Sequence, residues 1–104
     1  MRKYGNRIVN TQDGRFDSIR EWNRWRELVL LEKAGQITDL RRQVRFELIP
    51  KQDGEQACYY IADFVYRDDQ GMTVVEDCKG YKTEVYRLKR KLFQYRYNMK
   101  IRET

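Results

Sequence analysis

The spacing of apolar residues along the chain predicts two helices. Residues 18–34 carry apolar side chains three and four positions apart, as on one face of an amphipathic helix. Ser18 and Glu21 have the spacing of a capping box at the start of this helix, and Gly35 is suited to end it. Thr83 is placed to cap a second helix, which continues to about residue 97.

The other apolar runs are short and rich in β-branched and aromatic residues, which is typical of strands. Three of them cover residues 45–49, 58–67 and 72–79. Residues 68–71 form a hairpin turn between the last two, residues 1–15 a basic N-terminal arm with a short ribbon, and residues 99–102 a closing strand. The order helix, three strands, helix, strand predicts an α/β fold in which a mixed sheet is flanked by two helices.

The chain is short and poor in large aliphatic residues. Its 104 residues are the length of a single domain. Leu, Ile, Val and Phe together number only 24, while 37% of the residues are charged, so the hydrophobic core is expected to be thin. Part of the apolar surface is then expected to be buried against a second copy of the chain, as in a homodimer.

Residue types that are scarce or missing exclude several kinds of chemistry. Because the sequence has no histidine, Ser-His and Cys-His catalysis and histidine-ligated metals are excluded. Cys58 and Cys78 are too few for a four-thiolate zinc site and are expected to be reduced thiols. No apolar run approaches the roughly 20 residues of a membrane span, and the N-terminus has no signal-peptide pattern. We therefore expect a cytoplasmic protein.

Positive charge is concentrated near the C-terminus. The net charge is +6, but residues 79–102 alone contain nine basic side chains and one acidic side chain. Tyrosines are interleaved with these charges, and such a block favours a nucleic-acid partner. The alternative is a solvated helix face whose tyrosines pack in the core. The residues expected to contact a phosphate backbone are Lys82, Arg87, Lys89, Arg90, Lys91 and, in the N-terminal arm, Arg7.

Acidic residues occupy unusual positions in two neighbouring predicted strands. Asp63 lies among apolar residues, where a carboxylate is costly to bury unless it binds a cation. In the next strand, the alternation of side chains sends Asp77 and Lys79 to one face, and Glu76 and Cys78 to the other. In the predicted hairpin, Asp63 and Asp77 can lie side by side on the same face.

Two adjacent carboxylates repel each other unless a divalent cation lies between them. Oxygen ligands favour Mg²⁺, for which Mn²⁺ can substitute. We therefore expect Asp63 and Asp77 to be metal ligands, and Lys79 to orient a water or stabilise charge on a phosphate. Glu21 borders the inward face of the first helix and is a third candidate ligand. The simpler interpretations are an exposed ion pair between Asp77 and Lys79, and a helix-capping role for Glu21.

These segments together resemble a known nuclease superfamily. Residues 16–21, 62–64 and 76–80 resemble the motifs of the PD-(D/E)XK superfamily, which has a restriction-endonuclease-like core. The pattern is similar to that of small phage nucleases, including phage Holliday-junction-resolving endonucleases. One departure is Ala62, where the superfamily often has proline. The resemblance covers residues 16–101 and implies that the catalytic residues are Glu21, Asp63, Asp77 and Lys79.

The resemblance also implies a function. We expect a magnesium-dependent DNA endonuclease that leaves 5′-phosphate and 3′-hydroxyl ends. Its expected substrate is branched DNA or a Holliday junction in phage replication or recombination, in the host cytoplasm. Paired cuts at a junction would require two active sites and hence a homodimer. The alternatives are a nicking or end-processing nuclease of the same fold, and a non-catalytic DNA-binding protein.

Overall fold

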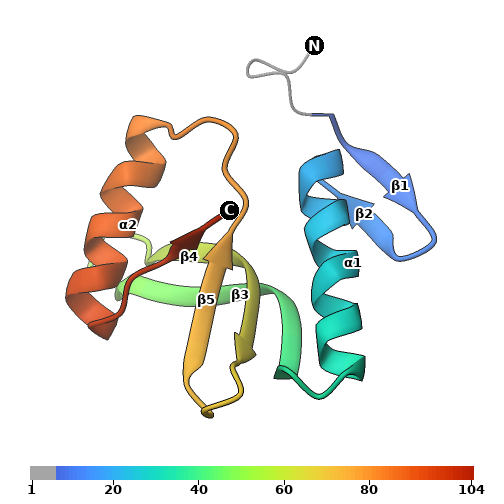
Figure 1. The fold of residues 1–104 in the computed structure, drawn as a ribbon. Coiled ribbons are helices and arrows are strands. Elements are labelled where there is room, and N and C mark those ends of the chain that lie inside the picture. The colour runs from blue at the N-terminus through green and yellow to red at the C-terminus, as the bar shows by residue number, and fades with distance from the viewer. Residues whose placement is uncertain (1–6) are drawn as a thin grey trace.

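The computed structural model describes residues 7–104, and in this range the predicted α/β order of elements is confirmed (Figure 1). The N-terminal ribbon is a two-stranded hairpin, and the predicted arm at residues 1–6 lies outside the described residues. The elements are β1 (Val9–Thr11), β2 (Gly14–Phe16), α1 (Ile19–Lys33), β3 (Thr38–Ile49), β4 (Cys58–Arg67), β5 (Thr73–Asp77), α2 (Glu84–Tyr97) and β6 (Arg102–Glu103).

The strands after the hairpin form a mixed sheet in the order β3-β4-β5-β6. The β3–β4 and β4–β5 pairs are antiparallel, whereas β5 and β6 are parallel. The connection from β5 to β6 runs through α2, as a parallel pair requires. The α1 and α2 helices lie on opposite sides of the sheet (Figure 1).

Each helix packs over its own hydrophobic cluster. Leu28 of α1 packs with Ile37, Phe64 and Tyr66, and the ring of Trp25 lies against this group, which we call the α1 cluster. The α2 cluster lies on the other side of the sheet. It is larger, and its buried members are Leu48, Tyr60, Ala62, Val65, Val75, Tyr86, Phe93 and Ile101. The thin core that the composition predicts is thus divided between two faces of one sheet.

The β3 strand is longer than predicted. We expected it to begin at residue 45, but it begins at Thr38. Residues 38–44 contain mostly polar and charged side chains, so they give no apolar run, although their backbone pairs with β4. Asp39 and Gln43 have positive φ angles of 57° and 52°, which strands of regular geometry do not contain.

Both long strands change face near their middle. In a regular strand, residues two apart share a face. Val44 in β3 and Ala62 in β4 pack in the α2 cluster, but Leu40 and Phe64, also at even-numbered positions, pack in the α1 cluster. The change falls at residues 43 and 63, and the ladder of paired residues skips this position. The positive φ of Gln43 supplies the backbone irregularity that it requires.

The predicted bounds of the last two strands were also wrong. The β5 strand ends at Asp77 rather than at residue 79. The backbone N–H of the next residue, Cys78, donates to the Asp63 carboxylate at 2.8 Å and so makes no backbone hydrogen bond to β4. The β6 strand begins at Arg102 rather than at residue 99. Asn98, at φ 53°, ends α2 in the left-handed conformation, and residues 99–101 return the chain to the sheet.

Candidate active site

The predicted juxtaposition of Asp63 and Asp77 is confirmed. Phe64 pairs with Glu76 in the antiparallel ladder, so the next step places Asp63 opposite Asp77. The hydrogen bond from the Cys78 N–H to Asp63 Oδ2 holds the Asp63 side chain at this end of β5. Burial raises the pKa of Asp63 most, and the negative charge of Asp77 raises it further, as expected for neighbouring carboxylates.

Asp77 is almost completely buried, with 1% of its surface exposed. The Tyr60 hydroxyl donates to its Oδ2 atom at 2.5 Å. Lys79 Nζ lies 3.1 Å from Oδ1 and 4.6 Å from the centroid of the Tyr86 ring. This ion pair lacks hydrogen-bond geometry, so the buried Oδ1 atom accepts no hydrogen bond. Asp77 Oδ1 therefore has the Lys79 ammonium as an ion-pair partner but no hydrogen bond, so it can still accept a further ligand.

Asp63 carries the most strongly shifted carboxyl group of the site. Its pKa is raised from 3.8 to about 8, first by burial and then by the charges of Asp77 and Glu21. The hydrogen bond from the Cys78 N–H opposes this shift but is outweighed. Burial and the neighbouring negative charges therefore favour the protonated form of Asp63, whereas a divalent cation would favour its ionised form.

Glu21 is also brought to the site. It is 3% exposed and lies in the first turn of α1, where its backbone N–H donates to the N-cap oxygen of Ser18 at 3.1 Å. Its carboxylate accepts a hydrogen bond from the Asp17 N–H. In a capping box it would instead accept from the N–H of the N-cap residue, Ser18. The second carboxylate oxygen accepts from the Gln43 side chain at 3.1 Å. The Glu21 side chain thus binds the backbone before the N-cap and faces the site in one conformation.

Gln43 is the main site residue that sequence reasoning missed. Its side-chain amide donates to Glu21 Oε2 at 3.1 Å and to Asp63 Oδ1 at 3.4 Å, so it links α1 to β4. Its φ of 52° costs on the order of 1 kcal/mol for a residue other than glycine. No motif marked this residue, because a single glutamine in a charged stretch has no distinctive spacing. Strain at a contact between two acids is typical of functional sites.

The residues present fit a divalent cation in part. The free Oδ1 of Asp77 and the shifted Asp63 favour a hard cation with oxygen ligands. However, no three Cys, Asp or Glu side chains of residues 7–104 converge as a ready ligand set. Glu21, the third predicted ligand, reaches the acidic pair through the Gln43 amide. Asp63 and Asp77 would hold the ion, and Glu21 would join them only after a local rearrangement.

An arginine that the motifs did not reveal lies beside Glu21. The Arg42 guanidinium lies 3.7 Å from the centroid of the Phe16 ring and donates to the Arg15 backbone oxygen at 2.8 Å. Its charge lowers the pKa of Glu21, although burial has the larger, opposite effect and the net shift is upward. A hollow of about 200 Å³ opens here, lined by Arg15, Asp17, Glu21, Arg42 and Gln43.

Glu76 lies on the opposite face from Asp77, as the strand alternation predicted. It is fully buried, and Arg24 Nε donates to it at 2.6 Å. The Tyr66 hydroxyl donates to its other oxygen at 2.9 Å. These partners neutralise and orient Glu76, so it is a structural acid between α1 and the sheet rather than a member of the site.

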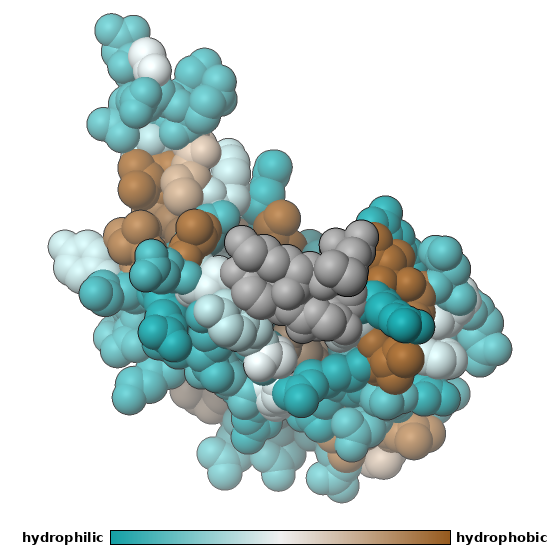
Figure 2. Space-filling view, turned by 90° about the horizontal axis from the view of Figure 1, so that it is seen from above, coloured by the Kyte–Doolittle hydropathy of each residue, from teal (hydrophilic) through white to brown (hydrophobic). Residues whose placement is uncertain are grey.

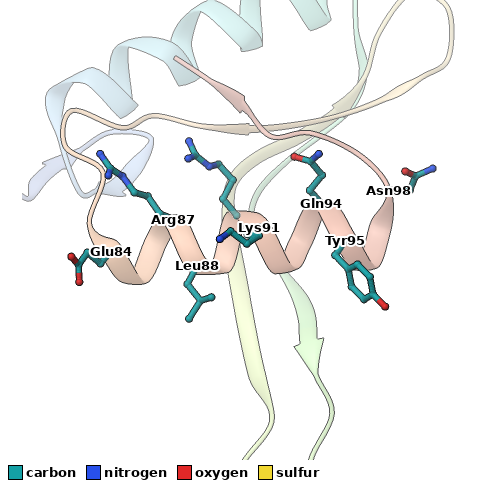
Figure 3. A pocket seen from close by; sticks show the side chains of 8 residues that line it. Glu84, Arg87, Leu88, Lys91, Gln94, Tyr95 and Asn98 are labelled. Carbon is teal, nitrogen blue, oxygen red and sulfur yellow. The ribbon is translucent and has the colours of Figure 1, made fainter.

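The predicted DNA-binding residues differ in their surroundings. Arg87 and Lys91 are exposed on α2 and line a shallow hollow of about 870 Å³ together with Leu88 and Tyr95. Figure 3 shows Arg87 projecting to one side of the helix, while Leu88 and Tyr95 project to the other. Arg90 instead pairs with Glu103 at 2.9 Å.

The remaining predicted contacts are placed less favourably. Lys82 and Lys89 are half-buried, at the start and in the middle of the α2 region, whereas Arg7 is exposed just before β1. The face of the molecule in Figure 2 is mainly hydrophilic, with hydrophobic atoms in separate small patches. The exposed cations of the predicted set are therefore Arg7, Arg87 and Lys91.

The fold and the site together define an α/β protein with a mixed four-stranded sheet and, where β4 and β5 meet, a pair of acids of which Asp77 is buried and Asp63 half-buried. The chain belongs to the DUF1064 family, a protein family of unknown function, whose model matches residues 1–104. No curated protein and no solved structure matches it. Neither helix in residues 7–104 is long and apolar enough to cross a membrane.

Proposed function

We propose that the protein is a magnesium-dependent DNA endonuclease of the PD-(D/E)XK type that acts on branched DNA such as Holliday junctions. The observation that carries this proposal is the pairing of Asp63 with Asp77, beside Lys79, at the end of two adjacent strands. The order of α1, β3, β4, β5 and α2 supports the resemblance, since it gives the helix and strands that carry these residues.

The charges around the pair support phosphodiester chemistry. Asp63 and the free oxygen of Asp77 are donors suited to Mg²⁺. When bound, Mg²⁺ would lower the pKa of water and offset negative charge on the phosphate. Lys79 is the only cation paired with Asp77 among the described residues, and 30% of its side chain is exposed. It can therefore contact both the buried acid and a substrate at the surface.

The chain's own residues have distinct tasks in this mechanism. Tyr60 and the Cys78 N–H fix the orientations of Asp77 and Asp63, respectively. Lys79 orients the attacking water and stabilises the charge that develops on the phosphate oxygens. The water oxygen forms a bond to phosphorus while the bond to the 3′ oxygen breaks. The water gives up a proton to solvent and the 3′ oxygen takes one from solvent, giving 5′-phosphate and 3′-hydroxyl ends. Burial of the acids keeps their geometry fixed during this exchange.

Binding is proposed to depend mainly on phosphate contacts. Arg87 and Lys91 are exposed and belong to a helix whose first turn lies next to the site, since Tyr86 contacts Lys79. Tyr95 is 88% exposed and offers a ring for stacking on an unpaired base. Unpaired or unstacked bases occur at branch points, so this surface favours branched over continuous duplex DNA.

The test is a cleavage assay with purified protein and end-labelled DNA. Four-way junctions, nicked duplex and linear duplex would be incubated with Mg²⁺, with Ca²⁺ and with EDTA. We expect cleavage with Mg²⁺, highest for the junction, and no cleavage by Asp77→Asn. The control is Glu55→Gln, which removes a carboxylate from the β3–β4 turn.

The outcomes separate the alternatives. Equal cleavage of all three substrates would replace junction specificity with a nicking or general nuclease. Tight binding without cleavage in any metal would indicate a non-catalytic DNA-binding protein. Cleavage that is equal in wild type and Asp77→Asn would contradict the proposal and indicate a contaminating enzyme.

A further inference from the structure

The Gln43 side chain lies between two carboxylates from different elements. Its Nε2 atom is 3.1 Å from Glu21 Oε2 and 3.4 Å from Asp63 Oδ1. The Glu21 carboxylate requires a donor there, so the amide nitrogen rather than the amide oxygen faces the two acids. The partial positive charge of the NH₂ group thus occupies the position between Glu21 and Asp63.

The backbone holds Gln43 in this position at a cost. Its φ of 52° lies in the left-handed region, in the middle of a strand, where β3 and β4 change face. The residue is also exposed, so the bridge is not needed to fill the core. The positive φ also serves the change of face, but the exposed side chain donates to the two acids, which indicates a role for the side chain at the acids themselves.

We propose that Gln43 is a ligand of the divalent cation, and that its amide rotates to present Oε1 in place of Nε2 when the cation binds. This inference rests on the carboxylate site of the proposed function. A cation bound by Asp63 and Glu21 competes with the NH₂ group for the same oxygens, so the two do not bind together. The terminal torsion of glutamine is soft, and its carbonyl oxygen is a hard ligand that Mg²⁺ and Mn²⁺ accept.

This exchange would bring a further oxygen ligand to the acids. No three acidic or cysteine side chains in the described range converge for metal binding. Removal of the NH₂ bridge frees Glu21 Oε2 and Asp63 Oδ1, and the rotated amide adds a neutral oxygen next to them. The same side chain thus donates hydrogen bonds to the acids without the cation and supplies a ligand with it.

The test measures Mn²⁺ binding directly, by isothermal titration calorimetry with MnCl₂ and no DNA. Wild type is compared with Gln43→Ala, Gln43→Asn and Gln43→Glu. We expect Gln43→Ala to weaken Mn²⁺ binding on the order of tenfold. Asparagine tolerates the left-handed backbone but is one methylene shorter, so Gln43→Asn is expected to resemble alanine. The control is Gln56→Ala, which removes an exposed glutamine from the β3–β4 loop.

A second measurement separates a ligand from a structural bridge. In EDTA, Gln43→Glu is expected to melt at a lower temperature than wild type, since it adds a third negative charge. With Mn²⁺, its melting temperature is expected to rise by more than that of wild type. A structural bridge would instead give a lower melting temperature for Gln43→Ala with unchanged Mn²⁺ affinity.

The possible failures are distinguishable. If Gln43→Ala binds Mn²⁺ as tightly as wild type or more tightly, the inference is overturned while magnesium-dependent cleavage is unaffected. If Mn²⁺ binding depends on Gln43 but the wild type cuts no DNA, the proposed function fails and the ligand role stands. If wild type binds no Mn²⁺, both are overturned.

Discussion

Gln43 and Asp63 face each other across β3 and β4 at the position where both strands change face, and the Gln43 amide donates to the Asp63 carboxylate at 3.4 Å. The side chain of Asp63 is thereby turned toward Asp77 and α1 rather than into either hydrophobic cluster. The irregularity of the sheet therefore positions the most strongly perturbed acid of the protein.

The shifted pKa of Asp63 predicts how stability depends on pH in the absence of metal. Because the folded pKa of about 8 exceeds the ordinary value of 3.8, the folded protein binds more protons than the unfolded chain between these values. This stabilisation is complete below pH 4 and is lost as the pH rises toward 8, by up to about 1.4 kcal/mol per pH unit.

Thermal melts in EDTA from pH 5 to 9 would measure this effect. The melting temperature of wild type is expected to fall across the range, and that of Asp63→Asn is expected to change much less. Equal slopes for the two proteins would show that another group controls the dependence.

Lys79 is predicted to act in the chemical step rather than in binding. Replacement by methionine keeps an unbranched side chain, one atom shorter, but removes its charge, and should lower kcat by about a hundredfold. Affinity for the junction in Ca²⁺ should change little, since the charge is paired with Asp77. Single-turnover cleavage and a filter-binding assay would measure the two quantities. A large loss of affinity with unchanged kcat would assign Lys79 to substrate binding.

The exposed face of α2 is predicted to set the salt dependence of DNA binding. Arg87→Gln and Lys91→Gln should each reduce the slope of log K against log salt concentration by about 1, if each side chain contacts one phosphate. Lys51→Gln, in the β3–β4 loop, removes the same charge and is the matched control. Fluorescence anisotropy from 50 to 300 mM salt would show the change, and identical slopes in all four proteins would place the DNA elsewhere.

The Arg24–Glu76 pair is predicted to stabilise the fold without affecting catalysis. Arg24→Met leaves Glu76 buried and without its cation, which should lower the free energy of unfolding by about 2–3 kcal/mol. The loss is smaller than for a fully buried pair because Arg24 is partly exposed. Adding Glu76→Gln should recover much of this loss. Urea unfolding would measure both, with the exposed Arg26→Met as control. A loss as large in the double variant as in Arg24→Met would mean that packing dominates.

Much of the fold could be predicted because its elements carry local signals. Ser18 and Thr83 do cap the two helices, and their side chains accept the N–H groups of Glu21 and Tyr86. The side-by-side placement of Asp63 and Asp77 followed from strand alternation and a short hairpin. These features depend on neighbours in sequence, so periodicity and turn residues were sufficient.

The parts that could not be predicted depend on contacts between distant segments. The first half of β3 is a strand because β4 provides hydrogen-bond partners, while its own sequence is polar. The role of Gln43 arises from a positive φ and from two acids 22 and 20 residues away. The position of Arg42 near the site could not be predicted, because it depends on the packing of its guanidinium against Phe16 of the N-terminal hairpin. A single sequence carries no local pattern that indicates contacts between such distant residues.

The change of face in β3 and β4 also affects how the protein unfolds. Each strand contributes side chains to both hydrophobic clusters, Phe46 and Leu40 from β3 and Ala62 and Phe64 from β4. Because β3 and β4 belong to both clusters, the packing of one cluster cannot be lost while these strands stay packed in the other. Denaturation is therefore expected to be one cooperative, two-state transition. A cation bound where β3 and β4 change face would stabilise the whole molecule rather than one half of it.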